Sequence, residues 1–131
     1  MTFVTKDSGK RVKFKSGMMR DVADDKLDID RVFDGPILRR YAALLTRGAK
    51  KYNDIEGSPN WMKANGEAEM IRARKSAARH FEQWRAGETD EDHAAATVFN
   101  INLYEYVKAR LATDAPKRAK KRTKPRSKKR R

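Results

Sequence analysis

A short acidic segment contains the residue types that bind divalent metals. It reads Glu88-Thr89-Asp90-Glu91-Asp92-His93. Carboxylate oxygens are the ligands that Mg²⁺ prefers, and carboxylates together with an imidazole nitrogen suit Mn²⁺. A structural interpretation competes, because acidic residues in a first helical turn stabilise the helix dipole and Thr89 with Asp92 matches a capping box. The spacing alone favours the structural interpretation.

Two polar residues outside this segment add to it. His80 is one of two histidines in the chain and lies beside Glu82, near the end of the preceding predicted helix. We expect it at the border of that helix's apolar face, where a hydrogen-bonded packing role competes with the role of ligand or base. Asn100 falls on a nearly all-apolar helix, and a buried amide without partners costs about 1–3 kcal/mol. It therefore either bonds a neighbouring helix or completes a pocket with His93.

A second group of residues suits a nucleotide. Lys50-Lys51-Tyr52 supplies ammonium groups for phosphates and an aromatic ring for stacking. Asn60-Trp61 lies in the segment 53–66, whose Gly, Asn and Ser-Pro residues indicate a loop. A tryptophan in a polar loop anchors the loop or contacts a ligand. Lysines at a helix end are also expected without any ligand, since they complement the helix dipole.

Three predicted helices position these groups. The first spans 36–52 and has a proline in its first turn. The second spans about 67–86 and stops at Gly87. The third begins after Thr89, is apolar nearly all round, and ends before Pro116, which predicts a central helix. The apolar face expected for the second helix comprises Met70, Ala73, Ala77, Phe81 and Trp84.

The predicted fold class is all-α, with three main helices in a small bundle. Residues 1–33 form an N-terminal arm of extended chain or short strands, 34–113 a helical nucleotide-binding core, and 114–131 a disordered basic tail. The sequence contains no Gly-rich phosphate loop, no H-E-x-x-H and no serine elbow, and no β-α alternation indicates a dinucleotide fold.

The positive charge is concentrated at the C-terminus. The 131 residues include 32 Lys and Arg against 18 Asp and Glu, a net charge of +14. Eleven of the basic residues lie in 117–131, which leaves 21 basic and 18 acidic residues, or +3, for 1–116. Such a tail binds polyanions in a salt-dependent way, serves as a nuclear-import signal, or only solubilises the chain. The expected nucleic-acid contacts are Lys117, Arg118, Lys120, Lys121 and Arg122.

The composition also indicates the cellular compartment in which the protein is expected. The chain has no Cys, which excludes disulfides, Cys-zinc sites and thiol nucleophiles. No apolar run approaches the roughly 20 residues of a membrane span, and the N-terminus lacks the apolar stretch of a signal peptide. We expect a protein without a membrane partner that stays in the cytoplasm, or in the host cytoplasm if a phage encodes it.

An ordered series of short motifs resembles a known phage-encoded family, the dATP/dGTP diphosphohydrolases, which are likened to the all-α MazG-type nucleoside triphosphate pyrophosphohydrolases. The resemblance covers roughly residues 16–107. The motifs are Ser16-Gly17-Met18-Met19-Arg20-Asp21, Lys26, Arg47-Gly48-Ala49-Lys50-Lys51-Tyr52, Asn60-Trp61, Ser76-Ala77-Ala78-Arg79-His80, and Gly87 to His93 with Asn100.

The resemblance implies an enzyme that uses Mg²⁺ or Mn²⁺ to cleave a (deoxy)nucleoside triphosphate into a monophosphate and pyrophosphate. It implies catalytic roles for His80, Glu91 and Asp92, and metal binding by Asp90, Asp92 and His93. The nucleotide would be held by Lys50, Lys51, Tyr52, Asn60, Trp61, Arg79 and Asn100. MazG-type enzymes carry E-x-x-E on one helix, whereas the predicted helix 36–52 has no acidic residue.

Two other functions compete with this one. The chain is also interpretable as a non-catalytic phage accessory protein that its basic tail tethers to DNA or RNA, or as an interaction module whose tail docks an acidic partner. A homo-oligomer is expected in each case, because three helices in about 80 residues bury only a thin core.

Overall fold

The computed structural model describes residues 2–54 and 56–122, with side chains as far as residue 114. The chain divides into two compact units, Met1–Asp34 and Gly35–Arg131. Among the described residues, no helix combines the length and the apolar character needed to cross a membrane.

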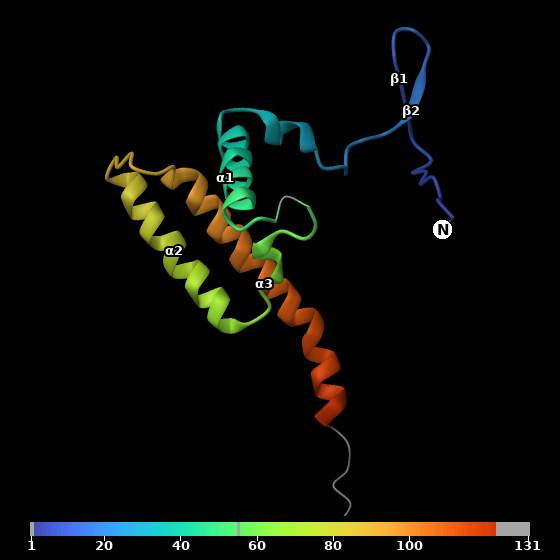
Figure 1. The fold of residues 1–131 in the computed structure, drawn as a ribbon. Coiled ribbons are helices and arrows are strands. Elements are labelled where there is room, and N and C mark those ends of the chain that lie inside the picture. Colours follow the sequence, from blue (N-terminus) through green and yellow to red (C-terminus); the bar gives the residue numbers. More distant parts are fainter. Residues whose placement is uncertain (1, 55, 123–131) are drawn as a thin grey trace, which may run out of the picture. The chain divides into compact units, whose positions relative to one another are not determined.

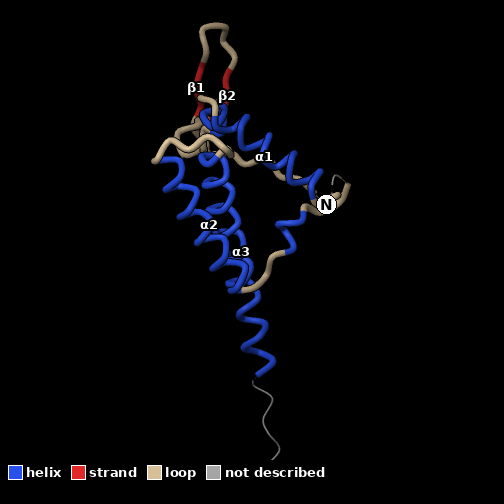
Figure 2. The backbone as a smooth tube through the Cα atoms, turned by 60° about the vertical axis from the view of Figure 1, so that its left-hand side comes forward, coloured by secondary structure: helices blue, strands red, loops and turns tan. Residues whose placement is uncertain are grey.

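The first unit contains a two-stranded antiparallel hairpin, which Figure 2 shows in red. Strand β1 spans Arg11–Lys13 and strand β2 spans Met19–Asp21, with Val12 opposite Arg20. Gly17 adopts a φ of 92° in the connecting turn, a conformation that favours glycine. A short 3₁₀ helix, η1, follows at Ile29–Phe33. The expected arm with short strands is therefore confirmed.

The second unit consists of the three main helices, and the predicted all-α bundle is confirmed. Helix α1 spans Ile37–Lys51, α2 spans Glu67–Arg85 and α3 spans His93–Arg122. Helices α2 and α3 form an antiparallel hairpin, and α1 packs on α3 (Figures 1 and 2). A short 3₁₀ helix, η2, at Asn60–Lys63 lies in the α1–α2 connection and contacts α3.

Small residues allow the helices to pack closely. The buried apolar residues are Ala64, Ala73, Ala95, Ala96 and Val107, four of them alanines. Gly87 comes just after the end of α2 and adopts a φ of 77°, which agrees with the prediction that the helix stops there. The core is thin, as expected, and α3 lies at its centre.

The start of α3 differs from the prediction. The helix begins at His93, and Asp92 precedes it with its Oδ1 accepting a hydrogen bond from the Ala95 N–H at 3.0 Å. Asp92 is thus the N-cap, and the predicted capping box opened by Thr89 is wrong. The physical reason is that Gly87 turns the chain sharply, and the five residues 88–92 precede the first helical residue, His93.

The end of α3 also differs from the prediction. The helix continues through Pro116 to Arg122, although the sequence predicts that it ends before this proline. A proline removes one backbone donor, whereas the lysines, arginines and alanine of 117–122 favour helix. The expected contacts Lys117, Arg118, Lys120, Lys121 and Arg122 therefore lie on a helical extension. The sequence predicts disorder for 114–131, whereas the residues up to Arg122 are helical and 123–131 lie outside the described residues.

The buried face of α2 is rotated relative to the predicted one. Phe81 and Trp84 are 48% and 54% exposed, so their predicted place in the core is wrong. His80 is 8% exposed and lies inside the α2–α3 interface, not at its border. The buried face of α2 carries Ala73 and His80 instead, and His80 has a polar partner on α3 that a sequence pattern does not reveal.

Candidate functional site

A cleft of about 1820 Å³ lies within the second unit. Residues of α1 and α2 form its walls, and residues of α3 from His93 to Leu103 form its floor. The α2–α3 turn closes one end, called here the acidic end. The loop 52–64 lines the other end, called here the loop end. The α3 residues that line the cleft run from His93 to Leu103, a length of about 15 Å along the helix.

Two histidines and an aspartate form a hydrogen-bonded chain at the acidic end. The Nδ1 atoms of His80 and His93 are 2.9 Å apart, and His93 Nε2 is 2.7 Å from Asp90 Oδ1. Both rings are buried, at 8% and 2% exposure. An ionised Asp90 only accepts hydrogen bonds, so His93 Nε2 carries the proton that it donates to Asp90.

These hydrogen bonds also determine which nitrogen of each ring carries the proton when both imidazoles are neutral. His93 Nδ1 is then the acceptor, and His80 Nδ1 donates its proton to it. His80 Nε2 is left with a lone pair. Burial, and next the charge of Arg79, lowers the pKa of His80 below its usual range, so His80 is neutral at pH 7. Such a nitrogen can accept a proton or bind a metal.

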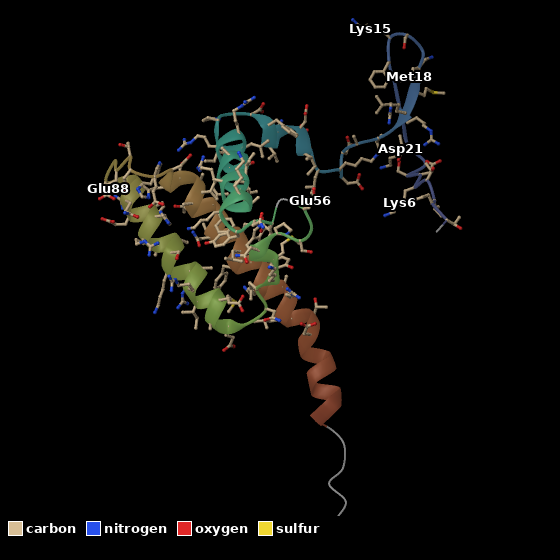
Figure 3. All side chains as sticks on the ribbon, viewed as in Figure 1. Lys6, Lys15, Met18, Asp21, Glu56 and Glu88 are labelled. Atoms are coloured by element: carbon tan, nitrogen blue, oxygen red, sulfur yellow. The ribbon has the colours of Figure 1, made fainter. Side chains whose placement is uncertain are left out.

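The same end can hold a cation. The potential ligand atoms of His80, Glu91 and His93 lie within 4.8 Å of one another, and so do those of Glu88, Asp90 and His93. Figure 3 shows Glu88 at the turn between α2 and α3. The hydrogen bond from His93 lowers the pKa of Asp90, which keeps its carboxylate charged. Carboxylate oxygens beside imidazole nitrogens are a donor set that fits Mn²⁺, and the carboxylates alone suit Mg²⁺.

Asp92 is placed differently from its neighbours. Arg40 on α1 donates two hydrogen bonds to its carboxylate, from Nε at 2.8 Å and from Nη2 at 2.6 Å. The bonds from Arg40 are the largest cause that lowers the pKa of Asp92 to about 2. Because Asp92 also caps α3, its carboxylate joins α1 to the start of α3. It lines the cleft, but it is absent from both groups of potential metal ligands.

A row of cations lies along the α1 wall. Arg40, Arg47 and Lys51 all line the cleft, and their spacing of seven and four residues places them on one face of the helix. Lys63 and Arg72 add two further cations. Arg40 and Arg47 are not among the predicted site residues, although a basic row at helical spacing is visible in the sequence.

The residues predicted to hold a nucleotide divide into two sets. The cleft is lined by Lys51, Tyr52, Asn60, Trp61 and Asn100. The other two, Lys50 and Arg79, are exposed and do not line it. The structure therefore brings five of the seven together around one space.

Trp61 has the anchoring contacts that the sequence suggested. Its ring meets Phe99 and Tyr106 edge-on, with centroids 6.3 and 5.1 Å apart. The Tyr106 hydroxyl and the Arg110 guanidinium donate hydrogen bonds to the Met62 carbonyl, which fixes η2 on α3. Trp61 thus holds the loop in place while part of it faces the cleft.

Asn100 is buried on α3, and its Nδ2 donates a hydrogen bond to the Ala96 carbonyl at 2.8 Å. Its amide therefore bonds within its own helix rather than to a neighbouring one. The residue also lines the cleft beside His93, which is the pocket position that the sequence suggested.

A helical cleft with cations along one wall and a carboxylate–imidazole cluster at one end is typical of proteins that bind phosphorylated ligands. Comparison with protein families agrees with this class. The family model described as dATP/dGTP diphosphohydrolase, N-terminal, matches residues 16–124. The match spans more than half of the chain, and the chain belongs to this family, which is one of nucleotide hydrolases. Comparisons with curated proteins and with solved structures give no match.

Proposed function

We propose that this protein hydrolyses (deoxy)nucleoside triphosphates to a monophosphate and pyrophosphate, with Mg²⁺ or Mn²⁺ as cofactor. One observation carries the proposal: a single cleft joins a row of cations, Arg40, Arg47 and Lys51, to the acid–histidine chain at its end. Family membership supports a nucleotide as the substrate.

In this proposal, the carboxylates of Glu88, Asp90 and Glu91 hold the metal at the acidic end, because both ring nitrogens of His93 are engaged by His80 and Asp90. Their donor atoms fall in the two groups whose members lie within 4.8 Å of one another. A divalent ion bound there would neutralise phosphate charge and activate a water molecule. Asp92 supports the site from outside the ligand groups, because its carboxylate holds Arg40 against the start of α3.

His80 is the proposed general base. Its Nε2 lone pair takes the proton of the attacking water, while its Nδ1–H remains bonded to His93. The positive charge that forms on His80 is stabilised through His93 by the carboxylate of Asp90, 2.7 Å from His93 Nε2. A buried, oriented imidazole of this kind needs no rearrangement to act.

The other cleft residues bind the substrate in this proposal. Arg47 and Lys51 contact the phosphates, since both are cations on the α1 wall. Tyr52 and Trp61 lie at the loop end and contact the base. The nucleotide thus lies along α3 with its phosphates toward the acidic end.

The direct test is release of pyrophosphate from a panel of dNTPs and NTPs, with Mg²⁺, with Mn²⁺, and with a chelator. Metal-dependent release, strongest with dATP or dGTP, is the expected result. An absence of turnover with every nucleotide and metal would contradict the proposal and favour the non-catalytic alternative.

A second role is proposed for the basic tail, which binds DNA or RNA. Eleven basic residues and no acidic one in 117–131 are the supporting observation, and α3 continues to Arg122 within this segment. Truncation before Lys117 is expected to abolish binding to duplex DNA, and the affinity of the intact chain is expected to fall steeply with salt. A flat salt dependence would contradict this role.

We also propose that the chain self-associates in the cytoplasm through α2 and α3. Phe81 and Trp84 form an exposed aromatic pair with centroids 5.8 Å apart, and Val98 and Ile101 on α3 are 40% and 53% exposed. The buried core of the described residues is small. Exposed apolar side chains of this kind therefore lower the stability of a single copy and favour association. A second copy would cover them.

A further inference from the structure

The hairpin of the first unit is a basic element that the proposed functions do not use. Residues 10–20 contain five basic residues and no acidic one. No residue of 2–34 is buried, so this unit has no core of its own. A unit of this size rarely buries enough surface to be stable alone, and a bound partner would stabilise it.

The pairing of the strands assigns the hairpin side chains to two faces. Alternate residues of a strand point to opposite faces, and residues opposite each other across the ladder share a face. On one face, Arg11 pairs with two carboxylates. Its Nη1 is 2.7 Å from Asp7 Oδ1 and 3.5 Å from Asp21 Oδ1. The charge of Arg11 is therefore already balanced within the first unit.

The other face has a different composition. It is called here the aromatic face and comprises Lys10, Val12, Phe14, Met18 and Arg20. Val12 lies opposite Arg20. Phe14 lies opposite Met18, because its N–H donates a hydrogen bond to the Met18 carbonyl at 2.9 Å and continues the same register. This face contains no carboxylate.

The side chains of the aromatic face are open to a ligand. Val12, Phe14 and Met18 are 42%, 47% and 55% exposed. Within the part of the chain that the structure describes, neither Lys10 nor Arg20 forms an ion pair. An exposed aromatic ring thus lies on the same face as two cations that have no anionic partner there.

We propose that the aromatic face binds single-stranded nucleic acid, with a base stacked on Phe14 and phosphates beside Lys10 and Arg20. Proteins that bind single strands combine cations for the backbone with aromatic rings for the bases, and this face carries both. A duplex buries the faces of its bases, so only an unpaired strand offers Phe14 a ring to stack on. The proposed hydrolysis is not needed for this role.

The turn of the hairpin does not suit a lipid surface. It reads Lys15-Ser16-Gly17, and Figure 3 shows Lys15 at the tip of the hairpin, with Met18 where the chain turns back. Insertion into a bilayer would bury this charged tip before the apolar side chains, which is costly. A nucleic-acid strand lying across the aromatic face leaves the tip in water.

The aromatic face complements the basic tail. Residues 117–131 contain no aromatic residue, so they contact phosphates whether or not a base is attached. The tail therefore supplies most of the affinity for a polyanion, and the aromatic face adds a preference for strands that carry bases. Two contacts on one chain reinforce each other, because the second forms within a complex that is already bound.

The test compares two labelled strands of equal length, oligothymidylate and an abasic deoxyribose-phosphate strand, which differ only in their bases. Binding to the intact chain is measured by fluorescence anisotropy. Phe14→Ala and Phe14→Leu remove the ring, and leucine retains an apolar side chain in the hairpin. The control is Phe3→Ala, because Phe3 is 87% exposed and lies outside the two strands. Arg20→Gln has Arg31→Gln as its control, since Arg31 pairs with Asp28 in the same unit.

The wild type and Phe3→Ala are expected to bind oligothymidylate at least fivefold more tightly than the abasic strand, since one stacked base supplies about that factor. Both Phe14 variants are expected to reduce this preference below twofold. Arg20→Gln should weaken binding of both strands and reduce the salt dependence, whereas Arg31→Gln should change neither. Equal binding of the two strands by the wild type would overturn the proposal, and so would a preference that survives Phe14→Leu.

The position of the contact is tested without any substitution. A strand with 5-iodouracil in place of thymine is crosslinked by light to the wild-type chain, and the modified residues are identified by mass spectrometry. Crosslinks to Phe14 or Met18 support the proposal. Crosslinks confined to other residues, such as Tyr52 and Trp61 of the cleft, overturn it. Binding to phosphatidylserine vesicles that Phe14→Ala abolishes, without any preference for oligothymidylate, would also overturn it and favour a lipid partner.

Discussion

The bond between Asp92 and Arg40 gives the sharpest prediction for stability. Asp92 has two separable tasks: it caps α3 through the Ala95 N–H, and it pairs with Arg40 through two bonds of 2.6 and 2.8 Å. Asn is a good N-cap but carries no charge, whereas Ala fulfils neither task. Asp92→Asn therefore removes the ion pair alone, and Asp92→Ala removes both.

The magnitudes follow from the structure. The pKa of Asp92 falls from 3.8 to about 2, a difference equivalent to at most about 2 kcal/mol. Solvent screening around the partly exposed pair reduces this to about 1 kcal/mol. Loss of an N-cap costs about 1 kcal/mol more. We expect destabilisation of about 1 kcal/mol for Asp92→Asn and about 2 kcal/mol for Asp92→Ala at pH 7.

The assay is thermal and urea unfolding followed by circular dichroism. For a helical unit of this size, about 1 kcal/mol shifts Tm by about 4–8 °C. Because the folded-state pKa lies below the unfolded value of 3.8, the contribution of the charge is complete above that pH and disappears as the pH falls towards 2. Wild type and Asp92→Asn should therefore converge in stability near pH 2.

Two results would contradict this division of roles at Asp92. Equal destabilisation by Asn and Ala would show that the charge matters and the cap does not. A difference between wild type and Asp92→Asn that persists undiminished to pH 2 would show that the carboxylate does not act through its ionised form.

Three further predictions concern the cleft, the tail and the exposed face. Lys51→Ala is expected to raise the KM for the nucleotide at least fivefold and Lys50→Ala less than twofold, because of these two lysines only Lys51 lines the cleft. Steady-state kinetics measure both values, and equal effects would contradict the placement of the nucleotide beside Lys51. Removal of residues 117–131 is expected to leave nucleotide turnover within twofold while abolishing DNA binding in a filter or gel assay, whereas loss of turnover would place the tail in the active site. Phe81→Glu is expected to lower the oligomeric state measured by light scattering, since it places a charge on the exposed aromatic pair, and an unchanged mass would exclude this face as the contact.

The sequence predicts the elements well because their signals are local. Gly87 stops α2, and the apolar stretch after His93 indicates the central helix. The faces are predicted less well, because which side of α2 is buried depends on what α3 presents. His80 is buried since His93 lies opposite, 2.9 Å away, and no periodicity within α2 contains that information.

The residues of the candidate site likewise differ in whether local sequence can reveal them. The acidic segment is visible in the sequence because its members are neighbours along the chain. The partner of Asp92 is not visible, since Arg40 lies 52 residues away and is brought to it only by the packing of α1 on α3. The burial of Asp54 Oδ1, which has no hydrogen-bond partner within the described part of the chain, is likewise a result of three-dimensional packing that no sequence pattern contains.

In the proposed mechanism, the hydrogen-bonded His80, His93 and Asp90 promote hydrolysis of a nucleotide at the bond whose cleavage releases pyrophosphate. The most direct measurement is product analysis of dGTP turnover by phosphorus NMR, with wild type, His80→Gln and the control Lys75→Ala, whose position on α2 is exposed and outside the cleft. We predict dGMP and pyrophosphate in equal amounts from the wild type and from Lys75→Ala, and a loss of at least a hundredfold in kcat for His80→Gln. Formation of dGDP and orthophosphate, or undiminished turnover by His80→Gln, would contradict the account.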